Sequence, residues 1–474
     1  MSLHSWYLLA LLVVAIALLI ALINSRVKLH PFVALLVVSV LVGVAAGEGP
    51  DKIASSLEDG AGGILGDVGM TLALGTMLGR LMADSGATDR IARSIVSRSS
   101  VRMLPFAMAA AAFVIGIPMF FEVGLIVLLP LVFSVAQQIK EQRPEVSSPY
   151  TLLMIPTVAA LATLHGMVPP HPGPLVAVDG LHADLGKTIL IGFICAVPTV
   201  LISGPLFARF MAHRVVIEPD AALVEQFTRA ETTGKLSGAG VPAGSVGGSG
   251  RDRKVRTAPA IVAILVPVAL MLFRTFAEIW LPEGSGVLKA ATLVGTPVVA
   301  MLIGFLYALV ALGFLAGRDG EDLRRSVSQS LQAVVGILLI IGGGGAFNGV
   351  LKSSGIGDAI ASATSTMNVS VVVLGWLLAL LLSVSTGSAT VGIVSATGIV
   401  APLLTHSGSW EASLVVVAIG AGSVGLNYVN HAGFWLVKES FGMSMGDATK
   451  THTAVQTLVS VVAFCCVLVL SIFV

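Results

Sequence analysis

The sequence has little charge, little cysteine and no HExxH motif, and each shortage counts against a class of protein. Only 11% of its 474 residues are charged and its net charge is +1, which leaves no basic surface for a nucleic-acid partner. Its three cysteines lie in apolar segments, which is typical of packing residues rather than of a disulfide or metal framework. HExxH is absent, and the sequence predicts no catalytic residue, no metal site and no cofactor.

Long hydrophobic runs are what the sequence does have. Hydrophobic residues make up 55% of the chain and its mean hydropathy is +0.95, too apolar for a soluble globule. A membrane helix needs about 20 mostly apolar residues. We therefore expect an all-α integral membrane protein whose crossings are residues 5–24, 31–47, 61–82, 149–168, 188–212, 258–280, 288–316, 333–351, 411–427 and 452–474.

The pattern SGxxDxIA occurs twice, at Ser85–Ala92 and at Ser354–Ala361, which indicates a duplicated membrane unit. A hydrophilic, glycine-rich stretch at 213–257 is typical of a flexible linker and separates residues 1–212 from 258–474. Five crossings are expected in the first half. Because five is odd, the second half must enter the membrane in the opposite orientation, and the halves are predicted to be inverted-topology repeats.

Positive charges predict the orientation of these repeats. If the linker 213–257 is cytoplasmic, most Lys and Arg residues lie on the cytoplasmic side of the predicted crossings. The outer side then keeps only Lys52, Lys187, Arg274, Lys289 and Lys352. This asymmetry predicts that both termini lie outside.

Two apolar stretches, 103–137 and 370–402, are too long for one crossing and have polar or helix-breaking residues at their centres. The centres read IPMFFEVG at Ile117–Gly124 and SVSTGSATVG at Ser383–Gly392. A re-entrant hairpin with its tip buried in protein keeps such residues out of lipid. The 269-residue offset between the SGxxDxIA copies places Gly387 opposite Pro118, so the two tips are predicted to be equivalent.

The segments that follow each hairpin are interrupted too. LHGMVPPHPGP at Leu164–Pro174 and SVGLNYVNHAGFW at Ser423–Trp435 place Pro, Gly, His or Asn where an apolar helix should continue. We expect discontinuous helices at about 149–183 and 411–440. Four irregular elements that meet near the membrane centre are typical of a secondary transporter.

Interrupted helices supply what a small anion needs in a membrane. Half-helix N-termini offer backbone N–H groups with a partial positive charge. Nearby hydroxyls at Ser388 and Thr390 and amides at Asn427 and Asn430 fit a hydroxylated substrate as donors and acceptors. The alternative is that small and hydroxylated residues simply allow close helix packing.

Glu122 is the acid of the first hairpin, and an intramembrane carboxylate indicates function by default. The alternative for Glu122 is a structural role, paired with an Arg or capping a helix. His165, His171 and His431 lie in the interrupted segments, and histidine titrates near physiological pH. The candidates for proton coupling are Glu122, His171 and His431.

Several motifs resemble the GntP family of gluconate permeases, within the wider ion transporter superfamily. They are FFEVGLIVLLPLVF at Phe120–Phe133, HGMVPPHPGP at His165–Pro174, GSATV at Gly387–Val391 and VNHAGFWLVKE at Val429–Glu439. The resemblance implies proton-coupled uptake of gluconate or a related sugar acid, by an elevator-type homodimer in the lipid of the bacterial cytoplasmic membrane. It places the substrate among Glu122, His165, His171, Ser388, Thr390 and Asn430.

Residue chemistry and the resemblance together define the candidate substrate-binding set. Its members are Phe121, Glu122, His165, Gly166, His171, Gly173, Thr386, Gly387, Ser388, Thr390, Asn427, Asn430 and His431.

Two positions depart from the family pattern. Ser383 stands where similar sequences tend to have Arg, and His431 stands where they tend to have Asp. The two differences together are consistent with one lost ion pair, so we expect a small hydroxycarboxylate, with gluconate as its leading member. The alternatives are a sodium-coupled carrier of another small organic acid and, with less support, a channel or a membrane enzyme.

Overall fold

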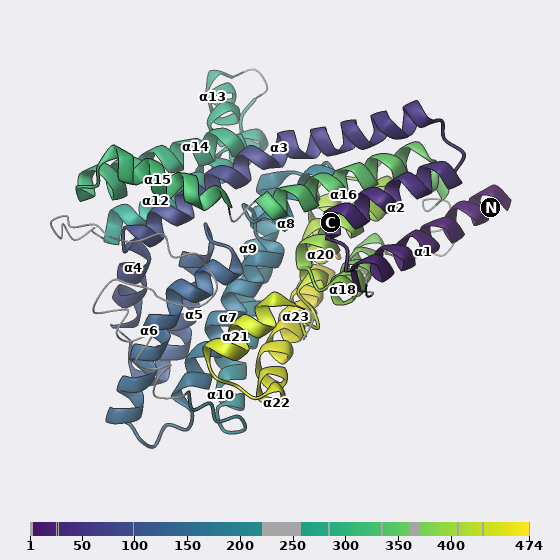
Figure 1. Ribbon diagram of the computed structural model, residues 1–474. Coiled ribbons are helices and arrows are strands. Elements are labelled where there is room, and N and C mark those ends of the chain that lie inside the picture. The colour runs from purple at the N-terminus through teal and green to yellow at the C-terminus, as the bar shows by residue number, and fades with distance from the viewer. Residues whose placement is uncertain are drawn as a thin grey trace.

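The computed structural model describes residues 3–24, 26, 28–97, 99–219, 257–282, 285–332, 335–359, 370–404, 407–428 and 431–473. Most of the predicted linker and the candidate Asn430 lie outside these ranges. The described part of the chain is helical throughout, with no strand (Figure 1). Nine of its helices are long and apolar enough to cross a membrane. The predicted all-α membrane fold is therefore confirmed.

The first repeat contains one helical hairpin and one broken helix, as predicted. The hairpin is α5 (Leu104–Gly116) followed by α6 (Phe121–Gln142), and the broken helix is α7 (Pro149–Met167) followed by α8 (Pro172–Gly180). Its other helices are α1 (Leu3–Asn24), α2 (Pro31–Ala45), α3 (Pro50–Asp84), α4 (Ala87–Val96), α9 (Leu185–Leu201), the π-helical η2 (Ile202–Leu206) and α10 (Phe207–Met211).

The second repeat also contains one helical hairpin and one broken helix. Its hairpin is α18 (Val371–Thr386) followed by α19 (Ala389–Val400), and its broken helix is α20 (Ser409–Ser423) followed by α21 (Ala432–Ser440). Its other helices are α12 (Thr257–Trp280), α13 (Gly286–Gly295), α14 (Pro297–Ala308), η3 (Leu309–Gly313), η4 (Phe314–Ala316), α15 (Gly320–Gln332), α16 (Val335–Ser353), α22 (Met445–Ala448), the π-helical η6 (Thr449–Thr453) and α23 (Ala454–Leu470).

One predicted crossing, 288–316, begins too early, because the apolar helix long enough to span the membrane is Pro297–Ala316. The chain breaks at Thr296, so that α13 projects from the molecule while α14 and its extension run to Ala316 (Figure 1). Pro297 begins α14, where its missing N–H costs nothing, whereas a proline inside a helix loses a hydrogen bond and clashes with the preceding turn, which favours a break here. Hydrophobicity alone does not register this break.

Helix lengths also differ from the predicted spans. The segments predicted at 31–47 and 411–427 form α2 and α20, of 15 residues each, which is less than a full crossing. In the first hairpin, α5 has 13 residues but α6 has 22, so one arm is long enough to span the membrane.

The long helix α3 lies antiparallel to α15 and α16 and joins the two repeats (Figure 1). Near the middle of this contact, a Cβ atom on Gly60 would overlap the carbonyl oxygen of Gly345. The backbones therefore touch, which requires glycine at both positions.

Polar contacts connect the helices at both ends of this packing. At the end of α3, Asp84 accepts hydrogen bonds from Arg80 (3.0 Å) and from Ser326 of α15. At the end of α16, the Ser353 hydroxyl donates to Glu48 (3.0 Å) and its carbonyl accepts from Lys52 Nζ (2.8 Å). Asp84 and Ser353 are 269 residues apart, so the two contacts are counterparts in the inverted repeats. Gly86 and Gly355, which follow them, both have positive φ, at 69° and 75°.

The four glycines Gly342–Gly345 serve close helix packing. A Cβ on Gly342 would lie 3.0 Å from Leu65 of α3, and one on Gly343 would lie 3.1 Å from Phe32 of α2. A Cβ on Gly344 would overlap Val394 of α19. Neighbours on three elements therefore surround this one turn of α16.

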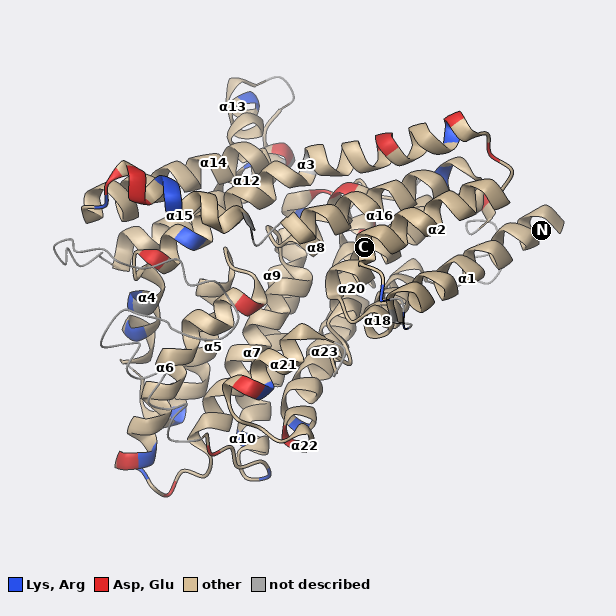
Figure 2. Ribbon diagram, viewed as in Figure 1, with Lys and Arg blue, Asp and Glu red and all other residues tan. Residues whose placement is uncertain are grey.

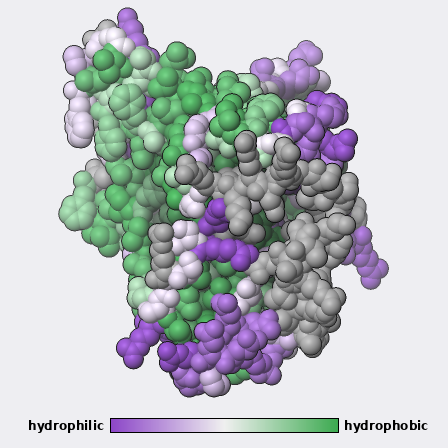
Figure 3. Space-filling model, turned by 90° about the vertical axis from the view of Figure 1, so that its left-hand side faces the viewer, coloured by the Kyte–Doolittle hydropathy of each residue, from purple (hydrophilic) through white to green (hydrophobic). Residues whose placement is uncertain are grey.

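Charge and hydropathy follow the membrane pattern. Figure 2 shows Lys, Arg, Asp and Glu gathered around α15, α4, the end of α6 and α22, and again at the far end of α3. The ribbon between these zones carries few charges. Figure 3 shows a face that is hydrophobic over much of its left half, with hydrophilic residues along its lower edge, at its upper right and in a small group near its centre.

Candidate functional site

The two hairpin tips are equivalent, as the repeat offset predicts. The first tip is the turn between Gly116 and Phe121, and the second is formed by Gly387 and Ser388. Gly387 ends α18 with φ of 73°, a left-handed conformation that favours glycine. Ser388 then caps α19, because its hydroxyl accepts from the N–H of Val391 at 3.3 Å.

Each second hairpin arm lies against the second half of the other repeat's broken helix. A Cβ on Gly173 of α8 would overlap Ile393 Cδ1 of α19, and a Cβ on Gly180 would lie 2.5 Å from Thr397 Cγ2. The helices α8 and α19 therefore run parallel, with their N-termini side by side. In the related contact, a Cβ on Gly433 of α21 would lie 3.1 Å from the Phe121 ring at the start of α6.

The first hairpin tip connects these two pairs of N-termini. Gly116 accepts a hydrogen bond from His171, the residue before α8, while Phe121 contacts Gly433 at the start of α21. The N-termini of α6, α8 and α21 thus meet around one tip, and α19 joins them through α8. Helix N-termini carry partial positive charge, so their grouping favours an anion.

The N-termini differ in the donors that they offer. In α8, Pro172 and Pro174 have no N–H, so Gly173 provides the one backbone donor of the first three positions. In α19, Ser388 uses the N–H of Val391, and those of Ala389 and Thr390 have no partner within the helix. The start of α19 is therefore the stronger anion-binding position of the two.

Two histidines hold the hairpins. His171 is buried, and its Nε2 donates to the carbonyl oxygen of Gly116 at 3.0 Å. His431 is also buried, and its ring is hydrogen-bonded to the backbone of Ser383 in α18. Each histidine precedes the second half of its broken helix and binds the first arm of the hairpin in its own repeat. The structure also brings Ser383 and His431, the two departures from the family pattern, into contact.

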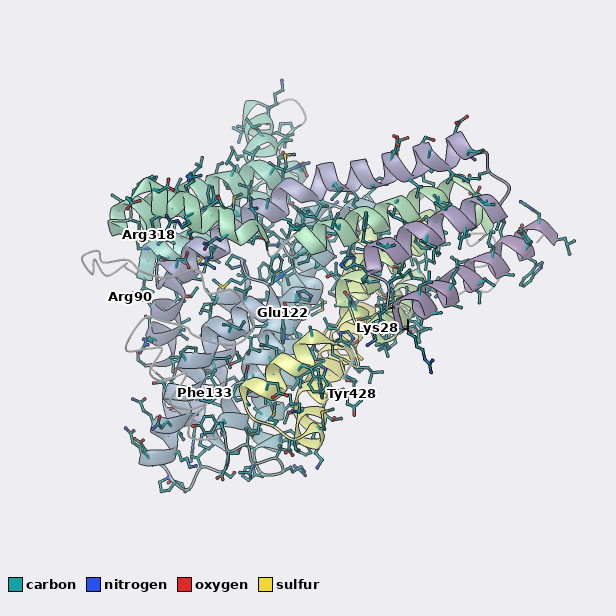
Figure 4. The ribbon with its side chains drawn as sticks, viewed as in Figure 1. Lys28, Arg90, Glu122, Phe133, Arg318 and Tyr428 are labelled. Atoms are coloured by element: carbon teal, nitrogen blue, oxygen red, sulfur yellow. The ribbon has the colours of Figure 1, made fainter. Side chains whose placement is uncertain are left out.

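Glu122 and His165 lie beside this arrangement. Glu122 is exposed near the start of α6 and lies in the middle of the molecule (Figure 4). The described part of the chain gives Glu122 no ion-pair partner, which does not support the alternative of a structural ion pair. His165 interacts electrostatically with Glu122, and its ring lies 5.8 Å from that of His171.

Several predicted candidates serve packing contacts. A Cβ on Gly166 would lie 2.7 Å from the carbonyl oxygen of Gly420, where α7 crosses α20. Gly173 is covered by Ile393, and the Thr386 hydroxyl donates to Leu382 within its own helix at 2.7 Å. Their role in binding substrate stays a prediction.

A small cavity lies at the first hairpin tip. It is lined by Leu72, Gly75 and Thr76 of α3, by the tip residues 117–120, and by Pro170 and His171. Its volume is about 20 Å³, which accommodates one or two water molecules rather than a sugar acid. A larger ligand therefore requires the tip and α3 to move apart.

The site predicted from the sequence did not include α23, the last helix. The break between α20 and α21 leaves backbone groups without helical partners, and hydroxyls of α23 and of the turn before it bind two of them. Thr453 donates to the carbonyl oxygen of Asn427 at 2.7 Å, and the Thr457 hydroxyl accepts from the N–H of Leu426 at 3.3 Å. Ser460 accepts from the Trp376 indole at 3.1 Å. The signal was the helical spacing of Thr453, Gln456, Thr457 and Ser460 in an otherwise apolar segment.

Comparisons with known proteins place this architecture in a family. The model of the GntP family permease matches residues 7–473. The chain is 42% identical to a gluconate permease of Pseudomonas aeruginosa over 99% of this chain and 98% of the relative. It is 35% identical to the D-serine transporter DsdX of Escherichia coli over 94% of each chain.

A solved structure has the same fold. MtrF of Neisseria gonorrhoeae superimposes with a TM-score of 0.62 at 14% identity, covering 95% of this chain and 96% of MtrF. The chain therefore belongs to the GntP family of permeases and is a multi-pass membrane transporter, not an enzyme.

Proposed function

We propose that this permease imports gluconate or a closely related sugar acid together with protons across the bacterial cytoplasmic membrane. The identity of 42% to a gluconate permease supports this substrate class over D-serine, whose named transporter is 35% identical. The observation that carries the proposal is the meeting of the α6, α8 and α21 N-termini at the first hairpin tip, with α19 beside α8.

The carboxylate of the substrate binds at the start of α19. The N–H groups of Ala389 and Thr390 and the partly exposed hydroxyls of Ser388 and Thr390 are donors there. Substrate hydroxyls pair with Asn427, whose Oδ1 is buried with no partner among the described residues. Asn430, His165 and Glu122 complete the proposed set.

Transport follows an elevator-type movement in a homodimer. The cavity between α3 and the first tip is far smaller than a sugar acid, so this conformation does not hold the substrate there. Hairpins and broken helices pack on each other, α3 packs along α15 and α16, and the two groups meet where α16 contacts α19 and α3 contacts α8. We propose that the first group moves against the second.

Proton coupling involves Glu122, His171 and His431. Of these, Glu122 is exposed and is the group that exchanges protons with the aqueous path, while the two histidines bind the hairpin backbones. Protonation of either imidazole would change the hydrogen bonds that hold a hairpin.

The test is uptake of labelled gluconate into proteoliposomes with an inward proton gradient. Accumulation that a protonophore abolishes, and that unlabelled gluconate inhibits better than D-serine does, is the expected result. Accumulation driven by a sodium gradient at constant pH would replace the proton with sodium. Stronger inhibition by D-serine would contradict the substrate class.

A further inference from the structure

His452 is a fully buried histidine to which the proposed function assigns no role. It lies in the π-helical turn η6, and its ring centroid lies 6.1 Å from that of Phe121 and 6.0 Å from that of Phe434. Neither ring nitrogen has a hydrogen-bond partner among the described residues. Buried polar atoms are normally paired, and π-helical turns are frequent at functional sites.

Other unpartnered polar atoms surround the same break. They are Nε2 of His431, Oδ1 of Asn427 and Oε1 of Gln456, from side chains that are at most 8% exposed. A positive charge on His431 disfavours a second one on His452, Gln456 lies one turn after His452, and the Asn427 carbonyl accepts from Thr453. We call Asn427, His431, His452 and Gln456 the polar cluster.

Among the unpartnered buried atoms of the polar cluster, acceptors outnumber donors, although the NH2 groups of Asn427 and Gln456 are donors as well. The His431 nitrogen that binds the Ser383 backbone carries hydrogen, which leaves Nε2 as an acceptor. The unpartnered oxygens of Asn427 and Gln456 only accept, and neutral His452 offers one donor and one acceptor. One additional proton converts an imidazole acceptor into a donor, and the described residues hold no group of acids, cysteines and histidines that would ligate a metal instead.

We propose that His431 and His452 together hold the coupling proton, an inference that rests on the proposed proton-coupled uptake. Glu122 is exposed, whereas a proton carried through a conformational change needs a buried site. Phe121 links the two places, because its ring packs on His452 and Gly433 while Glu122 follows it in α6.

The elements packed against η6 supply no buried counter-charge to His452. On α21, Lys438 pairs with Glu439 at 2.8 Å, and on α22, Asp447 accepts from the Ser444 hydroxyl at 2.6 Å. The remaining titratable groups on η6 and its neighbours are Lys450, Tyr150 and His165 of α7, Glu122 of α6, and Cys465 and Cys466 of α23.

The test separates exchange of substrate from its proton-driven accumulation. Full-length wild-type protein and His452→Gln are reconstituted, and labelled gluconate is followed first in counterflow without a pH gradient, then with an inward gradient of one pH unit. With one proton per substrate, wild type should accumulate about tenfold. His452→Gln should keep counterflow within about twofold of wild type, while accumulation and the substrate-induced pH change inside the vesicles are lost.

Phe434→Leu is the matched control, since it removes a ring that packs on His452 but leaves both imidazoles. It should accumulate as wild type does. His452→Gln that accumulates like wild type would overturn the proposal, as would loss of counterflow and accumulation together in both variants. Wild type that exchanges gluconate without responding to the pH gradient would instead refute proton coupling itself, and wild type without exchange would refute the substrate. If His452→Gln does not fold, His452→Asn provides the same comparison.

Discussion

Gly173 at the start of α8 lies directly against Ile393 of α19, so that the second hairpin rests on the first repeat's broken helix. Gly433, 260 residues later, has the related contact with Phe121 of the first hairpin. The second arm of each hairpin therefore packs against the broken helix of the other repeat. This packing aligns the helix N-termini on which the proposed site depends.

The crossing of α7 and α20 should tolerate no side chain. A Cβ on Gly420 would overlap the carbonyl oxygen of Gly166, and backbone cannot rotate away. We expect Gly420→Ala to lower the melting temperature in detergent, at a cost of about 1–3 kcal/mol or more. Gly62→Ala in α3, where nothing lies within 4 Å, is the control and should be neutral or stabilising. Equal melting temperatures would show that the crossing is looser than described.

The hydroxyl of Thr453 should stabilise the second break. Thr453→Val leaves the buried carbonyl oxygen of Asn427 without its donor, a loss of about 1–3 kcal/mol. Thr453→Ser retains the hydroxyl and should retain most of the stability. Thermal unfolding of both variants makes the comparison, and a Thr453→Val variant that is as stable as wild type would contradict this role of the hydroxyl.

Thr390 should contribute to substrate affinity. Its hydroxyl and N–H lie at the start of α19, and a hydrogen bond to a charged group contributes about 1.5–3 kcal/mol, so Thr390→Val should raise the gluconate KM roughly tenfold or more. Thr397→Val on the same helix, beside Gly180, should leave KM unchanged. A similar KM for wild type and Thr390→Val would remove the start of α19 from the site.

Ser383 and His431 should behave as a pair. Ser383→Arg alone buries an unpaired charge, and so does His431→Asp, each at a cost of about 3–5 kcal/mol. Because the two residues are in contact, the double variant should recover much of that stability. A double-mutant cycle on unfolding measures the coupling, and additive losses would show that no ion pair forms between these positions.

Local chemistry was sufficient to predict the irregular elements. Pro118, Gly387 and the run from Pro169 to Pro174 interrupt apolar segments in ways that helices cannot accommodate, so hairpins and broken helices follow from backbone constraints. The break at Pro297 carried the same kind of signal. It was missed because the hydrophobicity on both sides of it is continuous.

The contacts between the two repeats could not be predicted from the sequence. Nothing local to Gly173 indicates Ile393 as its neighbour, and a single histidine such as His452 in an apolar helix is most simply interpreted as a packing residue. Its lack of hydrogen-bond partners becomes visible only once Phe121, Phe434 and His431 surround it. Tertiary packing decides which polar residues are satisfied.

Movement of the first hairpin tip against α3 is the central claim of this account. In a cysteine-free background, Thr76→Cys on α3 and Phe120→Cys on the tip line the same cavity, so a short bifunctional thiol reagent should join them. Cross-linking should abolish gluconate uptake into proteoliposomes, and a reducible cross-linker should restore it on reduction. Glu48→Cys with Ser353→Cys, which joins the ends of α3 and α16, should leave uptake unchanged. Full uptake by the cross-linked Thr76→Cys, Phe120→Cys protein would contradict the account.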